Sequence, residues 1–137
     1  MRALLAVCAL LLAYVPAAII LSKRSLPDGA ILSGPFIRYA KSNAFMSFPV
    51  LPGALADEEN HRGQSTLALY EDETLLGPAH STNLDVQVDG RGRYSYWRHG
   101  TKMLLFSTSD NSDPNTNGRT YRVTDPRAHD PYQAQRR

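Results

Sequence analysis

Hydrophobic positions follow three different patterns along the chain. Residues 3–22 form one uncharged and mostly apolar segment between Arg2 and Lys23. Residues 23–64 carry short apolar pieces separated by prolines and glycines, and from Ser65 onward apolar and polar residues alternate over short runs. The three patterns predict, in order, a membrane segment, an irregular stretch and a set of β-strands.

The first segment is long enough to cross a lipid bilayer. About 20 residues of helix rise about 30 Å, which is the thickness of the hydrocarbon core. We therefore expect residues 1–24 to be a transmembrane anchor. A cleaved signal peptide is the alternative, because Met1-Arg2 gives a short positive start and small residues follow Pro16. The apolar run continues to Leu21, where a signal peptide would become polar, and this favours the anchor.

The second stretch, residues 25–64, is expected to be an irregular stalk. Seven prolines and glycines between Pro27 and Gly53 recur too often for a long helix. The apolar pieces between them are expected to pack partly on the domain that follows. As an alternative, the aromatic residues between Phe36 and Phe48 would lie at the membrane interface.

The alternating pattern predicts a mainly β domain over residues 65–124. The expected strands cover residues 66–70, 74–76, 84–88, 93–97, 101–108 and 119–124. Short strands at such regular spacing are typical of a small antiparallel sandwich or an open barrel. The tail, residues 125–137, lacks apolar periodicity and is expected to be disordered.

The same alternation predicts which side chains form the core. The expected core residues are Leu67, Leu69, Leu75, Val86, Val88, Leu104, Phe106 and Val123, with Trp97. About 60 residues bury little apolar surface, so a domain of this size needs further support. The only cysteine, Cys8, lies in the first segment, so no disulfide supplies it. The stalk, a metal ion or a partner protein would have to do so.

Length and charge exclude several classes of function. A chain of 137 residues has no room for a large enzyme with separate cofactor and substrate domains. Residues 66–124 hold six Lys and Arg against seven Asp and Glu, so the domain lacks the excess of positive charge that nucleic-acid binding requires.

The sequence also lacks the usual signs of an enzyme. The four histidines, which are scattered, are His61, His80, His99 and His129. None has a metal-ligand spacing with another histidine or a cysteine. A Ser/His/Asp triad can be assembled on paper, but no nucleophile elbow or phosphate loop supports one. We expect a protein that is not an enzyme.

One polar run matches the first half of a calcium-binding loop. Asp113, Asn115 and Asn117 alternate before Gly118, so their side-chain oxygens could turn toward one centre. An EF-hand is excluded, because Thr124 stands where that loop needs a bidentate glutamate. The alternative to a calcium site is a polar loop whose side chains cap its own turns. No other cofactor is expected.

A second group of residues could bind a ligand. Tyr94 and Tyr96 alternate with small or polar residues beside Arg93, and aromatic faces with planar polar groups suit sugar rings. Alternation puts these tyrosines on one strand face and Trp97 on the other, so we expect Trp97 in the core and the tyrosines at the surface. Arg119 completes the candidate ligand-binding set. The alternative is that the aromatic residues are core and cross-strand pairs.

Two stretches resemble a known type of module. They are Gly92 to Trp97 and Leu105 to Tyr121, the second ending in Ser-Asp-Asn-Ser-Asp-Pro-Asn-Thr-Asn-Gly-Arg-Thr-Tyr, and the shorter stretch Leu76 to Ser81 belongs to the same resemblance. This part of the chain is similar to a small β module of bacterial cell-surface and polysaccharide-pathway proteins. The resemblance covers less than half of the chain and implies an accessory or sugar-associated role. Catalytic domains sometimes accompany the module, but this sequence has no counterpart of them, so the resemblance implies no catalytic activity.

Taken together, these features predict a membrane-anchored accessory or recognition β domain, and the resemblance implies that it is carbohydrate-associated. The expected location is a bacterial inner membrane, spanned once, with the C-terminal domain in the periplasm. The charges flanking the anchor nearly balance, so they leave the orientation open. A structural single-pass subunit of a larger membrane complex is the alternative, because alanines spaced three and four residues apart favour close helix contact.

Overall fold

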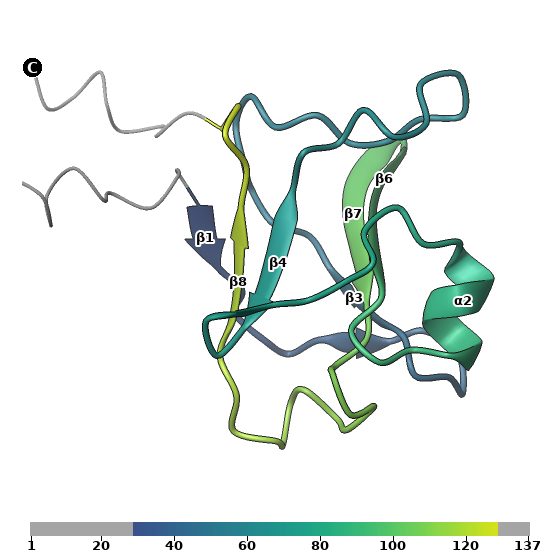
Figure 1. Ribbon diagram of the computed structural model, residues 1–137, viewed down its shortest axis with the longest axis vertical. Helices are drawn as coiled ribbons and strands as arrows, with labels where there is room; N and C mark the ends of the chain where they lie inside the picture. Colours follow the sequence, from purple (N-terminus) through teal and green to yellow (C-terminus); the bar gives the residue numbers. More distant parts are fainter. Residues whose placement is uncertain (1–28, 129–137) are drawn as a thin grey trace, which may run out of the picture.

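Two antiparallel sheets form the framework of the computed structural model, which describes residues 29–128 (Figure 1). Each sheet has four strands, in the orders β1-β8-β4-β5 and β2-β3-β7-β6. The elements are β1 (Gly29–Ile31), β2 (Ile37–Arg38), β3 (Phe45–Ser47), β4 (Ala68–Glu71), β5 (Thr74–Leu75), α2 (Asn83–Val88), β6 (Tyr94–His99), β7 (Thr101–Phe106) and β8 (Tyr121–Thr124). The expectation of a mainly β fold is confirmed.

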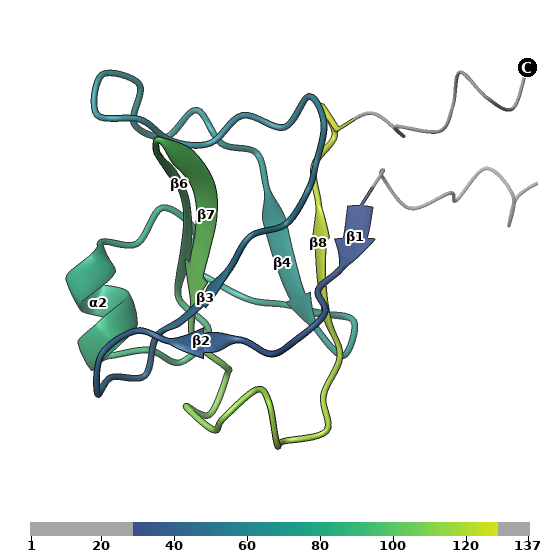
Figure 2. The same cartoon turned by 180° about the vertical axis from the view of Figure 1, so that it is seen from behind.

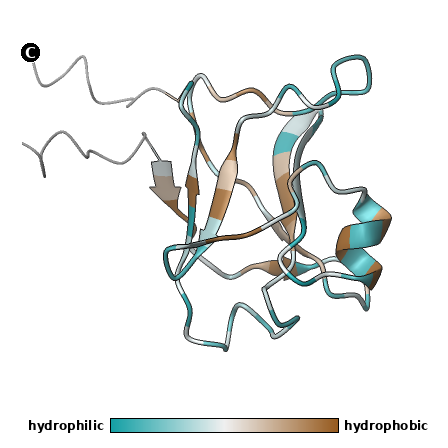
Figure 3. Cartoon of the chain, in the orientation of Figure 1, coloured by the Kyte–Doolittle hydropathy of each residue, from teal (hydrophilic) through white to brown (hydrophobic). Residues whose placement is uncertain are grey.

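The two sheets face each other across an aromatic core, in a sandwich-like arrangement. Tyr121 from the first sheet packs on Phe106 from the second, with ring centroids 5.4 Å apart. Phe36 stands edge-on to both rings, at 5.3 Å from Phe106 and 5.7 Å from Tyr121. Leu69 and Val123, fully buried, extend this core along the first sheet. By contrast, the long loop between β7 and β8, at the bottom of the view, is largely hydrophilic (Figure 3).

Residues 29–48 contribute β1 to one sheet and β2 and β3 to the other, so the expectation that residues 25–64 are irregular is wrong at these three strands. Strand β1 pairs with β8, with Gly29 opposite Thr124, and β3 pairs with β7, with Phe45 opposite Phe106. Strands of two or three residues fit between the prolines, which therefore do not interrupt a ladder. The small core was expected to need support from the stalk, a metal ion or a partner protein, and the stalk provides such support.

The segment that was expected to be a strand over residues 84–88 is instead the short helix α2. The side chain of Thr82 caps it by accepting a hydrogen bond from the Asp85 N–H at 3.1 Å. The Asp85 carbonyl accepts from the N–H groups of Asp89 and Gly90, both at 3.0 Å. Gly90 then turns the chain with φ +63°. Capping residues at both ends thus override an alternation that alone predicts a strand.

Most of the other sequence expectations within the domain are confirmed. The hairpin around residues 71–73 forms between β4 and β5, and β6, β7 and β8 lie within or close to the ranges expected for them. The expected core residues that are buried are Leu67, Leu69, Val86, Leu104, Phe106 and Val123. Leu75 is 59% exposed, because β5 is an edge strand, and Val88 is 65% exposed, because a short helix buries only one of its apolar side chains.

The start of the tail is packed against the domain rather than disordered. Asp125 is fully buried and accepts hydrogen bonds from the Thr66 hydroxyl and the Arg127 N–H, both at 2.8 Å. The Ala128 N–H closes this turn onto the Asp125 carbonyl at 3.0 Å. A polar turn of this kind has no apolar periodicity, so the pattern of the sequence did not reveal it.

The predictions for the membrane anchor and for the rest of the tail fall on residues 1–28 and 129–137, which lie outside the described residues. Among residues 29–128, no helix has both the length and the apolar composition needed to cross a membrane.

Candidate functional site

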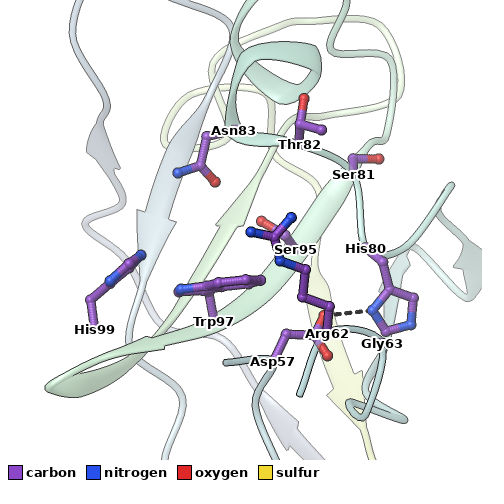
Figure 4. Close-up of a pocket in the computed structure, with 10 residues that line it drawn as sticks. All are labelled: Asp57, Arg62, Gly63, His80, Ser81, Thr82, Asn83, Ser95, Trp97 and His99. Carbon is purple, nitrogen blue, oxygen red and sulfur yellow. Dashed lines mark hydrogen bonds and ion pairs between the residues drawn. The ribbon is translucent and has the colours of Figure 1, made fainter. Parts of the chain in front are cut away.

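A pocket of about 300 Å³ opens beside the edge strand β6. Three segments line it, as Figure 4 shows: the loop over residues 57–63, the segment 80–83 that leads into α2, and one face of β6. The lining residues are Asp57, Arg62, Gly63, His80, Ser81, Thr82, Asn83, Ser95, Trp97 and His99. An aromatic ring and a dense set of polar groups therefore share one cavity.

The two faces of β6 have opposite surroundings, and they are the reverse of those expected. Tyr94 and Tyr96 point into the core between the sheets and are only 4% and 2% exposed. Ser95 and Trp97 lie on the other face, where they line the pocket. The sequence thus predicted correctly which residues share a face of the strand, but it predicted the wrong face to be buried.

The loop over residues 57–63 is held against β6 by main-chain hydrogen bonds. The Asp57 N–H donates to the Tyr96 carbonyl at 2.8 Å, and the Arg98 N–H donates to the Asp57 carbonyl at 2.9 Å. Glu58 and His61 bond to each other through their main chains, which closes the loop. The loop over residues 57–63 therefore forms a fixed wall of the pocket.

A buried carboxylate joins this loop to the opposite wall of the pocket. The Asp57 side chain is 2% exposed, and its Oδ2 lies 2.6 Å from Nδ1 of His80. Its Oδ1 accepts a hydrogen bond from the Ser65 N–H at 2.9 Å. His80 holds a left-handed backbone conformation, φ +55°, that is uncommon for a residue with a side chain. Both oxygens of Asp57 thus have partners, and the pair fixes the width of the pocket.

Two polar atoms on the β6 side of the pocket are buried without a hydrogen-bond partner among the described residues. They are Oγ of Ser95 and Nε1 of Trp97. A buried polar group that stays unpaired costs about 1–3 kcal/mol, so such groups are uncommon in folded proteins. The exposed His99 ring lies beside the Trp97 ring, with the two ring centroids 5.7 Å apart.

The tyrosines expected to bind a ligand are part of the core. The Tyr94 hydroxyl donates to the Leu67 carbonyl at 3.1 Å. Burial raises the pKa of both Tyr94 and Tyr96. In this structure neither ring presents a face on which a sugar could stack, so the alternative role as core residues describes them correctly.

The two arginines of the candidate set are engaged in internal contacts. Arg93 donates to the Gly90 carbonyl at 3.2 Å and lies 3.7 Å from the Asp89 carboxylate. Arg119 bonds the buried Glu71 carboxylate at 2.5 Å and holds Asp110 in two hydrogen bonds. Neither arginine lines the pocket, so the structure does not bring the expected ligand-binding residues together.

Arg119 lowers the pKa of the neighbouring Asp110. Hydrogen bonds from the Arg119 guanidinium, and then from Ser112, hold the pKa of Asp110 well below its usual range. The same ion pairs, with Asp110 first and Glu71 second, raise the pKa of Arg119. Glu71 also accepts from the Ser109 N–H at 2.8 Å. This network ties the β7–β8 loop to β4.

The three residues of the calcium hypothesis hydrogen-bond to their own loop and to its neighbours. Oδ1 of Asp113 accepts from the N–H of Asn115 at 2.9 Å, which lowers the pKa of Asp113. Oδ1 of Asn115 accepts from the Phe36 N–H at 2.7 Å, and Oδ1 of Asn117 accepts from the Arg119 N–H at 3.1 Å. Oxygens that are engaged in this way fit the alternative of a self-capped loop. Within residues 29–128, no cluster of three His, Cys, Asp or Glu side chains could hold a metal ion.

The pocket residues were not recognised as a group from the sequence. Asp57 and Arg62 lie in a stretch that the charge pattern marks only as a solvated loop, and His80 follows a Gly-Pro turn. One signal did point to the site, because Ser95 shares a strand face with Trp97. No pattern in the sequence indicates that segments 57–63 and 80–83 meet at that face.

Comparison with known proteins adds no family to this description. No protein-family model, no curated protein and no solved structure matches the chain. The run from Ser109 to Tyr121, the most distinctive part of the resemblance to a bacterial β module, forms the β7–β8 loop and the first residue of β8, away from the pocket lining. The stretch Gly92 to Trp97, which belongs to the same resemblance, contributes Ser95 and Trp97 to that lining. That resemblance stays a prediction.

Proposed function

We propose that this protein is a membrane-anchored recognition domain that binds a carbohydrate in the pocket beside β6. The observation that carries the proposal is the composition of this pocket, in which Trp97 lies among polar side chains and two buried polar atoms lack partners. Sugar rings offer the complementary groups. Their apolar C–H faces pack on aromatic rings, and their hydroxyls donate to and accept from planar polar side chains.

The polar groups of the pocket suit a hydroxyl-rich ligand. Asn83 and Arg62 are exposed at its walls, where an amide and a guanidinium can each make two hydrogen bonds. The Asp57 carboxylate is already paired with His80, so it contributes rigidity rather than a free charge. A volume of about 300 Å³ is at the small end of ligand pockets, which favours one sugar unit at a time.

The anchor and the location come from the sequence and are part of the same proposal. A recognition domain that is held at the membrane by residues 1–24 would meet glycans of the cell envelope. The resemblance to a sugar-associated β module agrees with this role. Its most distinctive run, Ser109 to Tyr121, lies outside the pocket, whereas Gly92 to Trp97 contributes Ser95 and Trp97 to the lining.

A glycan array probed with the full-length protein in lipid nanodiscs tests this proposal. We expect binding to one class of glycan. Trp97→Ala should lower the affinity at least about tenfold, which corresponds to about 1.4 kcal/mol. Asn83→Ala should lower the affinity as well. Because Asn83 is exposed, this variant should melt at the same temperature as the unmodified protein.

Tyr39→Ala is the matched control, because Tyr39 is an aromatic residue that is 37% exposed and does not line the pocket. This variant should bind like the unmodified protein. If no glycan binds, or if Tyr39→Ala lowers binding as much as Trp97→Ala, the carbohydrate proposal is wrong.

A further inference from the structure

A second hollow, of about 420 Å³, lies where β1, β2 and β3 approach one another. Figure 2 shows these three strands and the chain that joins them. The hollow is lined by eleven residues, of which nine are apolar and the other two are Ser33 and Ser47. None is charged, although 20% of the chain is charged. We call this surface the apolar groove.

Several large side chains of the apolar groove are open to solvent. Ile31 is 66% exposed, Ile37 54%, Phe48 50% and Val50 82%. Single exposed apolar residues are ordinary on a protein surface, but a contiguous group of them marks an interaction site. We therefore expect another molecule to cover the apolar groove in the functional state of the protein.

The sequence next to the apolar groove indicates what covers it. Strand β1, which contributes Ala30 and Ile31 to the lining, begins at Gly29. Only residues 23–28 separate it from the uncharged segment 3–22, and so short a piece of chain spans at most about 25 Å. Lys23 and Arg24, in that piece, suit the headgroup region of a bilayer.

We propose that the apolar groove docks on the surface of the lipid bilayer, with Ile31, Ile37, Phe48 and Val50 inserted among the lipid headgroups and upper acyl chains. This inference rests on the anchor of the proposed function but not on its sugar pocket. Strand β2 is one edge of its sheet and β6, which carries Trp97, is the other edge. Docking through β2 would leave the pocket beside β6 open to water and to soluble glycans.

A lipid surface fits the apolar groove better than a protein partner does. Protein interfaces carry about one hydrogen bond per 100–200 Å² and use charged or aromatic residues to select the partner. The only polar side chains lining the groove are those of two serines. A bilayer needs no such groups, because burial of apolar area alone drives insertion at its interface.

Spin labels on the full-length protein in nanodiscs of phosphatidylcholine and phosphatidylglycerol test the docking. In a Cys8→Ser background, which removes the only native cysteine, one label is placed at Val50→Cys and a second, in a separate variant, at Ile37→Cys. Leu84→Cys is the control, since Leu84 is 66% exposed on α2, away from the apolar groove. Collisions with oxygen, which concentrates in lipid, are compared with collisions with a water-soluble nickel chelate.

We expect the ratio of oxygen to nickel collisions to be several-fold higher at Val50→Cys and Ile37→Cys than at Leu84→Cys. Equal ratios at the three positions would overturn the proposal. Labels at Val50→Cys that are shielded from both reagents and broaden one another would show that a second copy of the chain covers the groove, which also overturns it. If the chain does not remain with the nanodiscs, the anchor and the docking are both wrong, whereas a glycan array probed with the full-length protein without nanodiscs still tests the pocket.

Discussion

Two buried carboxylates of this domain, those of Asp57 and Glu71, bond to residues that are distant in the sequence. Asp57 bonds His80 across 23 residues, and Glu71 bonds Ser109 across 38 and Arg119 across 48. Removing one partner from a buried pair leaves an uncompensated charge, which is costly. Each of these pairs therefore fixes a loop on the sandwich-like body, and Asp57 with His80 fixes the walls of the candidate site.

At the residue scale, Asp110 makes stability dependent on acid pH. A carboxyl group whose folded pKa lies below its unfolded value stabilises the fold above about pH 4, and this stabilisation is lost as the pH falls through the folded pKa. We therefore expect Asp110→Asn to melt at a lower temperature than the unmodified protein at neutral pH. The difference should shrink as the pH falls below about 4.

Thermal melting followed by circular dichroism at several pH values measures this difference. Glu59→Gln is the control, because Glu59 is an exposed carboxyl group in the 57–63 loop. Its melting temperatures should run parallel to those of the unmodified protein. A gap between Asp110→Asn and the unmodified protein that widens toward acid pH would contradict the role given to Arg119.

At the scale of elements, the end of α2 depends on a glycine. Gly90 has φ +63°, and a Cβ atom there would lie 2.1 Å from Oδ1 of Asn111. That oxygen accepts from the Arg91 N–H at 2.7 Å, so Asn111 cannot move without losing a bond. We expect Gly90→Ala to reduce the free energy of unfolding by about 3 kcal/mol, from left-handed strain and this clash together.

Gly100→Ala is the matched variant in the β6–β7 turn. Gly100 has φ +70°, but a Cβ atom there would meet nothing within 4 Å. It should cost only about 1 kcal/mol, the strain alone. Urea denaturation of both variants gives the comparison, and equal losses would mean that Asn111 gives way easily.

The sequence predicted those elements that depend on a strong local pattern of apolar and polar residues. Strand β6 follows from alternation and β7 from the apolar run after the turn at Gly100, and the two strands pair as an antiparallel hairpin. The segment 84–88 alternates equally well but becomes α2, because Thr82 and Gly90 decide its ends. Alternation reports which residues share a face and not which face is buried, so Trp97 and Tyr96 were assigned to the wrong sides.

The parts that depend on distant contacts were not predictable from the sequence. Strands β1 and β3 are three residues each, too short to show a period, and they exist because β8 and β7 offer them partners. The pocket likewise needs the loop of Asp57 to reach β6, and that contact is made by main-chain groups which any residue possesses. Only the aromatic and polar character of the β6 segment pointed toward a ligand.

At the scale of the whole molecule, two surfaces of different chemistry lie at opposite edges of one sheet. The apolar groove adjoins β2, and the polar pocket with Trp97 adjoins β6. A domain held to a bilayer by one edge and binding a ligand at the other would keep the ligand clear of the membrane. Both proposals thus use the same arrangement, although each has its own test.

The most direct test of the central claim uses Trp97, the only tryptophan of the chain, as its own reporter. The full-length protein in nanodiscs is titrated with the glycan selected on the array, while tryptophan emission and heat of binding are both recorded. We predict a saturable change in emission that follows the heat of binding, because the sugar contacts the Trp97 ring. Heat of binding with unchanged emission would place the sugar elsewhere and contradict the assignment of this pocket.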